Sequence, residues 1–126
     1  MEYNDTLKWL KSYKILHDKL IYINNRIKGV QAISYDDGSG TGKSLNELID
    51  EKTKVIQQME EIEDTIDRIE DKYTNMVIGY RYLLFMSVEE ISGEMEKSES
   101  WVKNRTKEGI KQIIIDIGQR EGFVRF

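Results

Sequence analysis

The glycine-rich stretch that ends in Gly42-Lys43-Ser44 contains residue types that bind nucleotide phosphates in other proteins. That phosphate-binding motif needs a glycine five residues before Gly42, where this chain has Asp37. The motif also follows a buried strand, whereas this stretch follows a predicted helix. We therefore interpret the stretch as a connection between two helices and predict no nucleotide site in it.

Side chains that could transfer protons or bind metal ions are present, but their pattern favours neither task. The chain has no cysteine and a single histidine, His17, which argues against thiol chemistry and the common zinc sites. The acidic run at residues 60–71 offers neighbouring carboxylates. Because they alternate with apolar residues at helical spacing, a solvated helix face explains them better. The sequence therefore predicts no catalytic residue, no metal site, no cofactor and no enzyme activity.

Composition and charge indicate the class of protein. The 126 residues include no proline, and 33% of them are charged, which favours long helices over sheets. The net charge of -4 is unevenly spread, with +2 over residues 1–43, -8 over residues 44–97 and +2 over residues 98–126. The sequence shows no signal peptide and no run of about 20 apolar residues. We therefore expect an all-α, cytoplasmic protein that does not enter a membrane.

Two helices with one apolar face each are predicted in the first part of the chain. The first extends from about Asp5 to Lys28. Its apolar positions recur at spacings of three and four residues: Trp9, Tyr13, Leu16, Leu20, Ile23, Ile27 and Val30. A second repeat of the same kind extends from Leu45 to Tyr80, with Lys52 as its one polar member. Each helix therefore has an apolar stripe to bury.

The two helices are expected to bury these stripes against each other. The Gly/Ser-rich loop at residues 31–44 would reverse the chain, and a capping box of Ser44 and Glu47 would begin the second helix. We predict an antiparallel helical hairpin, a coiled coil, over residues 1–73. The same apolar faces could instead mediate self-association, and a homodimer is expected.

The rest of the chain has the proportions of a three-helix, helix-turn-helix unit. The apolar stretch at residues 76–86 indicates burial in a globular unit. A second capping box, formed by Ser87 and Glu90, would begin a short helix from Val88 to about Glu96. A turn of about three residues follows it. We predict that this unit covers residues 74–117 and that residues 118–126 form a frayed C-terminal tail.

The last predicted helix, from Glu99 to about Ile117 with Ser98 as its cap, carries the candidate functional residues. The candidate DNA-binding residues are Ser98, Glu99, Ser100, Trp101, Lys103, Asn104, Arg105, Lys107 and Lys111. Asn104 is suited to reading an adenine edge, and the lysines and Arg105 to neutralising phosphates. Trp101 could stack on the DNA backbone or fill the core, and we expect partial burial.

The sequence from Tyr80 to Arg105, YRYLLFMSVEEISGEMEKSESWVKNR, resembles region four of bacterial sigma factors. There, an Arg-Tyr element precedes a short helix and a Ser-initiated recognition helix. The layout of the whole chain resembles the ArpU and RinA-like late transcription regulators of Gram-positive phages and integrated elements. By motif, the resemblance covers residues 77–113.

The resemblance implies that Ser98, Glu99, Ser100, Lys103 and Asn104 face promoter DNA. It places Ile91, Val102, Gly109 and Ile110 in the core, and it puts Gly93 where a small residue permits a close helix approach. We therefore expect a sequence-specific DNA-binding regulator in the bacterial host cell, acting on double-stranded DNA with RNA polymerase or another host protein. The alternative is a phage-encoded inhibitor or adaptor that binds a host factor through the acidic hairpin.

Overall fold

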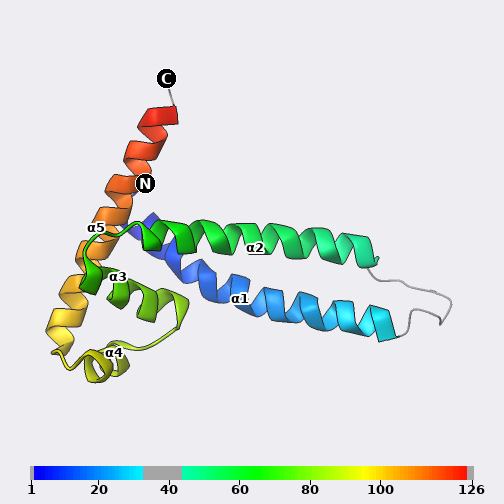
Figure 1. The fold of residues 1–126 in the computed structure, drawn as a ribbon, viewed down its shortest axis with the longest axis horizontal. Coiled ribbons are helices and arrows are strands. Elements are labelled where there is room, and N and C mark those ends of the chain that lie inside the picture. Colours follow the sequence, from blue (N-terminus) through cyan, green and yellow to red (C-terminus); the bar gives the residue numbers. More distant parts are fainter. Residues whose placement is uncertain (1, 33–43, 125–126) are drawn as a thin grey trace. The chain divides into compact units, whose positions relative to one another are not determined.

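The structure is a computed structural model, and it describes residues 2–32 and 44–124. These residues form five α-helices and one π-helical turn, and no strand occurs among them. The elements are α1 (Tyr3–Ala32), α2 (Leu45–Asp67), α3 (Lys72–Ile78), η1 (Gly79–Leu83), α4 (Val88–Met95) and α5 (Glu99–Val124). The all-α prediction is therefore confirmed (Figure 1). No helix in this part of the chain is long and apolar enough to span a bilayer.

The chain divides into two compact units, and their boundary differs from the predicted division after residue 73. The larger unit comprises Met1–Lys14 and Ile62–Phe126, and the smaller unit comprises Ile15–Glu61. Both α1 and α2 therefore belong to two units. The start of α1 and the end of α2 therefore lie in the same unit as α3, α4 and α5.

In the smaller unit, α1 and α2 lie side by side and antiparallel (Figure 1). Their buried side chains Ile23, Leu48 and Val55 all belong to the apolar repeats of the sequence. Ser44 caps α2, because its Oγ accepts the N–H of Glu47 at 3.2 Å. The end of α1 occupies the first positions of the predicted loop. Gly42 and Lys43, with the rest of that loop, lie outside the described residues.

The second predicted helix stops at Asp67, so the prediction of one helix from Leu45 to Tyr80 is wrong. The apolar repeat is buried only as far as Ile69, and Tyr73 is 52% exposed. In α3 the buried residues occupy other positions of the helix: Thr74, Val77 and Ile78. Because the chain leaves the helix between α2 and α3, the side chains of α3 do not continue the helical rotation of α2. The apolar spacing continues across the break in the sequence, but it no longer marks the buried side.

Two polar side chains stabilise this break between α2 and α3. Asp71 caps α3, with its Oδ2 accepting the N–H of Thr74 at 2.9 Å. Asn75 Nδ2 donates to the carbonyl oxygens of Ile66 and Ile69 at 3.0 and 3.1 Å. Backbone groups on both sides of the break are thereby satisfied, which removes the main penalty for ending a helix inside a packed unit.

The core of the larger unit lies among α3, α4 and α5. Val77, Ile91 and Val102 are fully buried and pack together. Gly109 of α5 is buried against α3, and a Cβ added there would lie 2.4 Å from Cγ1 of Ile78. The two helices therefore approach more closely than any larger residue at position 109 would allow without movement.

The last helix continues to Val124, so the predictions that it ends near Ile117 and that residues 118–126 form a frayed tail are wrong through Val124. Ile117 is buried, and three residues further along the same helix Arg120 is anchored. Arg120 Nη2 donates to Thr65 Oγ1 of α2 at 3.2 Å and lies 3.1 Å from Asp116 Oδ2. These contacts hold the helix beyond the point at which its apolar pattern ends.

Candidate nucleic-acid interface

α4 and α5 form the segment in which the sequence predicts a helix-turn-helix. At the start of α4, the Ser87 Oγ accepts the N–H of Glu90, and the Ser87 N–H donates to Glu90 Oε1, both at 3.1 Å. α5 begins after Ser98, whose Oγ accepts the N–H of Trp101 at 3.1 Å. Both predicted caps are confirmed, and they define where the two helices start.

The turn between α4 and α5 is held by its own hydrogen bonds. Glu96 adopts φ 55° and ψ 44°, the left-handed conformation that commonly ends a helix. The N–H of Lys97 donates to the carbonyl oxygen of Ser92 at 3.1 Å, and the Ser92 hydroxyl donates to the Lys97 carbonyl oxygen. The backbone of the turn therefore helps to set the angle between the two helices.

The expected core positions of this segment are mostly confirmed. Ile91, Val102, Gly109 and Ile110 are all buried. The expectation for Gly93 is wrong, because a Cβ added there would meet no atom within 4 Å. Close packing of α5 occurs against α3, at Gly109, and not at Gly93.

Seven of the nine candidate residues are exposed, and we call them the exposed face of α5: Ser98, Glu99, Ser100, Lys103, Asn104, Lys107 and Lys111. From Ser100 onward, these positions are three or four residues apart, except for the adjacent Lys103 and Asn104, so their side chains lie on one side of the helix. The opposite side is buried through Val102, Thr106 and Ile110. The structure therefore gathers hydroxyl, amide and ammonium groups on one solvent-exposed strip.

Trp101 lies at the edge of the core, in agreement with the expected partial burial. Its ring is 6.1 Å from that of Tyr73, centroid to centroid, in an edge-on arrangement at 73°. Lys97 Nζ lies 5.5 Å from the centroid of the Trp101 ring, a cation–π distance. These contacts orient the indole and place it between the core and the turn.

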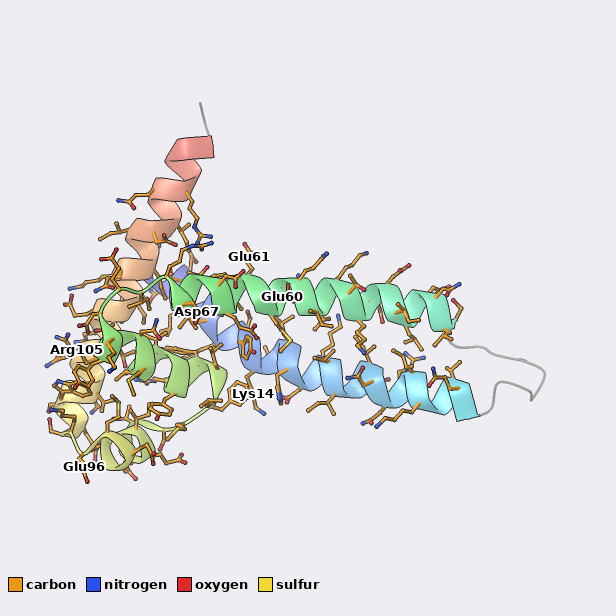
Figure 2. All side chains as sticks on the ribbon, in the orientation of Figure 1. Lys14, Glu60, Glu61, Asp67, Glu96 and Arg105 are labelled. Atoms are coloured by element: carbon orange, nitrogen blue, oxygen red, sulfur yellow. The ribbon has the colours of Figure 1, made fainter. Side chains whose placement is uncertain are left out.

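Arg105 does not belong to the exposed face, so the expectation that it neutralises a phosphate is corrected. It lies beside the start of α3 (Figure 2), with its Nη1 3.7 Å from Asp71 Oδ2 and 3.4 Å from Thr74 Oγ1. Hydrogen bonds from Thr74 lower the pKa of Asp71, and the Arg105 charge lowers it further. Arg105 therefore links α5 to the cap of α3.

The exposed face of α5 carries charges of both signs. Lys103, Lys107 and Lys111 are cationic, but Glu99 is exposed at the start of the same helix, and Glu108 Oε1 is 3.9 Å from Lys111 Nζ. α4 adds three exposed carboxylates: Glu89, Glu90 and Glu94. Attraction to a polyanion would therefore come from few cations, which limits the affinity that one copy can reach.

The other residues singled out in the sequence do not form a site. His17 is partly exposed, with its Nδ1 3.5 Å from Asp18 Oδ1. In the acidic run, Glu63 accepts a hydrogen bond from Tyr13, and burial together with this bond raises the pKa of Tyr13. No group of three His, Cys, Asp or Glu side chains in residues 2–32 and 44–124 could hold a metal ion.

A second group of cations was missed in the sequence. Lys11, Lys14 and Arg81 line a groove of about 500 Å³ in the larger unit. The available signal was the window of residues 6–17, which contains three lysines and no carboxylate in an otherwise acidic chain. Arg81 could not have been assigned to that group, because it is distant in sequence.

No protein-family model, curated protein or solved structure matches this chain. The exposed face of α5 and the groove beside α1 are therefore the features from which a function is inferred.

Proposed function

We propose that this chain binds double-stranded DNA through the exposed face of α5 and regulates transcription. The observation that supports this most directly is the division of α5 into a buried side and an exposed side. Asn104, Lys103 and Lys107 lie on the exposed side, in the first half of a helix that follows a short, hydrogen-bonded turn. A helix presented in this way can enter the major groove with its N-terminal residues toward the bases.

Each type of side chain on this face would have a separate task. Asn104 would read an adenine edge through its amide, and Ser100 would bond to a base or a phosphate. Lys103, Lys107 and Lys111 would contact phosphates, which adds affinity without sequence information. Glu99 fits this surface only where it can accept a hydrogen bond from a cytosine amino group.

A homodimer would compensate for the small number of cations on one copy of α5. Two copies related by a two-fold axis would read half-sites about 34 Å apart, one turn of the duplex. The resemblance of residues 77–113 to sigma region four supports action at a promoter with RNA polymerase, in a phage or mobile-element context. Both the dimer and the polymerase contact belong to the proposal.

The test is to incubate the full-length chain with sheared DNA from its source genome at low and near-physiological salt, and to sequence the bound fragments. We expect enrichment of one short site, and its symmetry will show whether a dimer binds. In Asn104→Ala the enrichment should weaken, because the preference at one base pair of the site is lost. Uniform recovery of all fragments, or no recovery at either salt concentration, contradicts sequence-specific DNA binding.

A second candidate function is binding of a host protein through the acidic α2. Glu60, Glu61 and Asp67 are exposed on this helix (Figure 2), in the segment that carries most of the negative charge. A basic partner would bind this surface without using α5. A pull-down from host lysate with the full chain as bait, repeated after Glu60→Lys and Asp67→Lys, distinguishes this function, because those changes should leave DNA recovery intact.

A further inference from the structure

The groove beside α1 has an apolar floor and cationic side chains. The proposed DNA binding by α5 involves neither of them. The groove lies in the larger unit, between the start of α1 and the segment that joins η1 to α4. Leu10 and Tyr82 are buried at its base, and Phe85 and Met86 are half-buried along it. Methionine and aromatic side chains adapt readily to an apolar ligand.

The segment at Phe85 is held in an unusual backbone conformation. Phe85 has φ 60°, in the left-handed region that bulky residues rarely adopt. Its ring lies 6.1 Å from that of Tyr13, centroid to centroid, with Lys14 Nζ 4.8 Å from its centroid. The preceding Leu84 is 62% exposed. Apolar surface is therefore presented to solvent next to the groove, where it could contact a partner.

The charged residues that line the groove all have the same sign. Lys11, Lys14 and Arg81 are cationic, and Lys8, one turn before Lys11, is also exposed. The Arg81 guanidinium is held in place, because its Nη1 donates to the buried Thr106 Oγ1 at 3.3 Å. A guanidinium has five N–H donors, so this bond leaves others for a ligand. The chain as a whole has a net charge of -4, so the groove is positively charged on a chain that is negatively charged overall.

We propose that the groove binds a short acidic segment of a protein partner, in which an apolar side chain lies between carboxylates. The carboxylates would pair with Lys11, Lys14 and Arg81, and the apolar side chain would pack on Phe85 and Met86. A DNA backbone would match the cations but would leave the apolar floor without a ligand. The combination of charge and apolar surface therefore favours a peptide over a nucleic acid.

The groove and the exposed face of α5 are separate surfaces of the larger unit. The residues that line the groove belong to α1, to η1, to the segment that leads into α4 and to the start of α4, and none of them belongs to α5. A protein partner could therefore occupy the groove while α5 contacts another ligand. The inference does not depend on DNA binding, and the two proposals can be tested with different variants of the full chain.

The probe is a displayed library of random peptides, selected against the full-length chain and then against the double variant Lys11→Glu/Lys14→Glu. Both lysines are exposed, so the charge reversal should leave the buried Leu10 in place, and thermal unfolding checks this. We expect selected peptides to be rich in Asp and Glu around an apolar residue. Their affinity should fall at least about tenfold for the double variant.

The matched control is Lys103→Glu/Lys107→Glu, which makes the same charge change on the exposed face of α5. It should leave peptide affinity unchanged and abolish recovery of DNA, so failure of one proposal does not imply failure of the other. Selection of peptides without acidic enrichment, or equal binding to the Lys11→Glu/Lys14→Glu variant, overturns the groove proposal. If the native chain selects no peptide and the Lys11→Glu/Lys14→Glu variant loses DNA recovery, the groove is reassigned to nucleic acid.

Discussion

Gly109 of α5 lies directly against Ile78 of α3. A Cβ at position 109 would stand 2.4 Å from Ile78 Cγ1 and 2.6 Å from its Cδ1. Ile78 is fully buried, so it has little space into which to move. We expect Gly109→Ala to lower the free energy of unfolding by about 1–2 kcal/mol, because overpacking outweighs the gain in helix propensity. Urea unfolding measures the change.

Gly118 provides the control on the same helix. A Cβ added there meets no atom within 4 Å, so Gly118→Ala should raise the free energy of unfolding by up to about 1 kcal/mol. Opposite signs for the two substitutions would support the close approach of α3 and α5. Stabilisation by Gly109→Ala would show that these helices are further apart.

Asn75 is expected to matter for stability although it lies outside the apolar core. Its amide donates to the Ile66 and Ile69 carbonyl oxygens. We expect Asn75→Ala to lower the free energy of unfolding by about 1–2 kcal/mol, because α2 then loses its C-terminal partner. Asn104→Ala is the same substitution at an exposed position and should change stability by less than about 0.5 kcal/mol. Equal effects would argue against the capping role.

The roles of Asn104 and Lys107 in DNA binding can be separated by sequence preference. Asn104→Ala should relax the preference at one base pair of the selected site, at a cost of about 1–3 kcal/mol in binding. Lys107→Ala should weaken all duplexes alike and reduce the salt dependence of binding by about one counterion. Fluorescence anisotropy on the selected site and on a scrambled duplex measures both. A loss of preference in Lys107→Ala, or a uniform loss in Asn104→Ala, would contradict these roles.

Glu96 occupies a conformation that glycine adopts more easily. Its φ of 55° is left-handed, and its side chain is exposed. We expect Glu96→Gly to raise the free energy of unfolding by about 1 kcal/mol, because the left-handed strain of a side chain is removed. Glu96→Gln removes the charge but keeps the strain, so it should have little effect in the same urea titration. Equal stabilisation by both variants would assign the gain to charge.

Asp71 should make stability depend on pH in the acid range. Its pKa in the folded chain is lowered from the ordinary value of 3.8, first by the hydrogen bonds from Thr74 and then by Arg105. Its contribution is therefore present above that ordinary value and is lost as the pH falls through the lowered pKa. The difference in stability between the native chain and Asp71→Asn should be unchanged from about pH 7 to about pH 5 and should shrink as the pH falls below about 4. A difference that stays constant over this range would show that the Asp71 charge has no role.

Much of the local structure was predictable from the residues alone. Ser44, Ser87 and Ser98 cap helices because a short hydroxyl side chain satisfies the first free N–H groups wherever the backbone turns into a helix. The inward positions Val102 and Ile110 also followed from periodicity, because one side of an amphipathic helix must be buried. The same periodicity placed Asn104 and Lys107 outside, so most of the candidate site could be predicted.

The break after Asp67 shows where periodicity was insufficient. The apolar spacing continues from Ile69 to Tyr73, but the hydrogen bonds of Asp71 and Asn75 end one helix and begin another. Those bonds join groups up to nine residues apart and become favourable only when the helices are packed. Asp71 followed by Thr74 was a visible N-cap signal, yet it competed with a stronger apolar pattern.

The helical class, the three serine caps and the buried side of α5 could be predicted from the residues, because these features depend on interactions between residues close together along the chain. The packing of the helices explains why Arg105 points to Asp71 instead of solvent, and why α5 continues past Ile117. It also brought Arg81 beside Lys11 and Lys14 in one groove. Such contacts join residues distant in sequence, so their geometry depends on how the helices pack, which the local pattern of residue types does not specify.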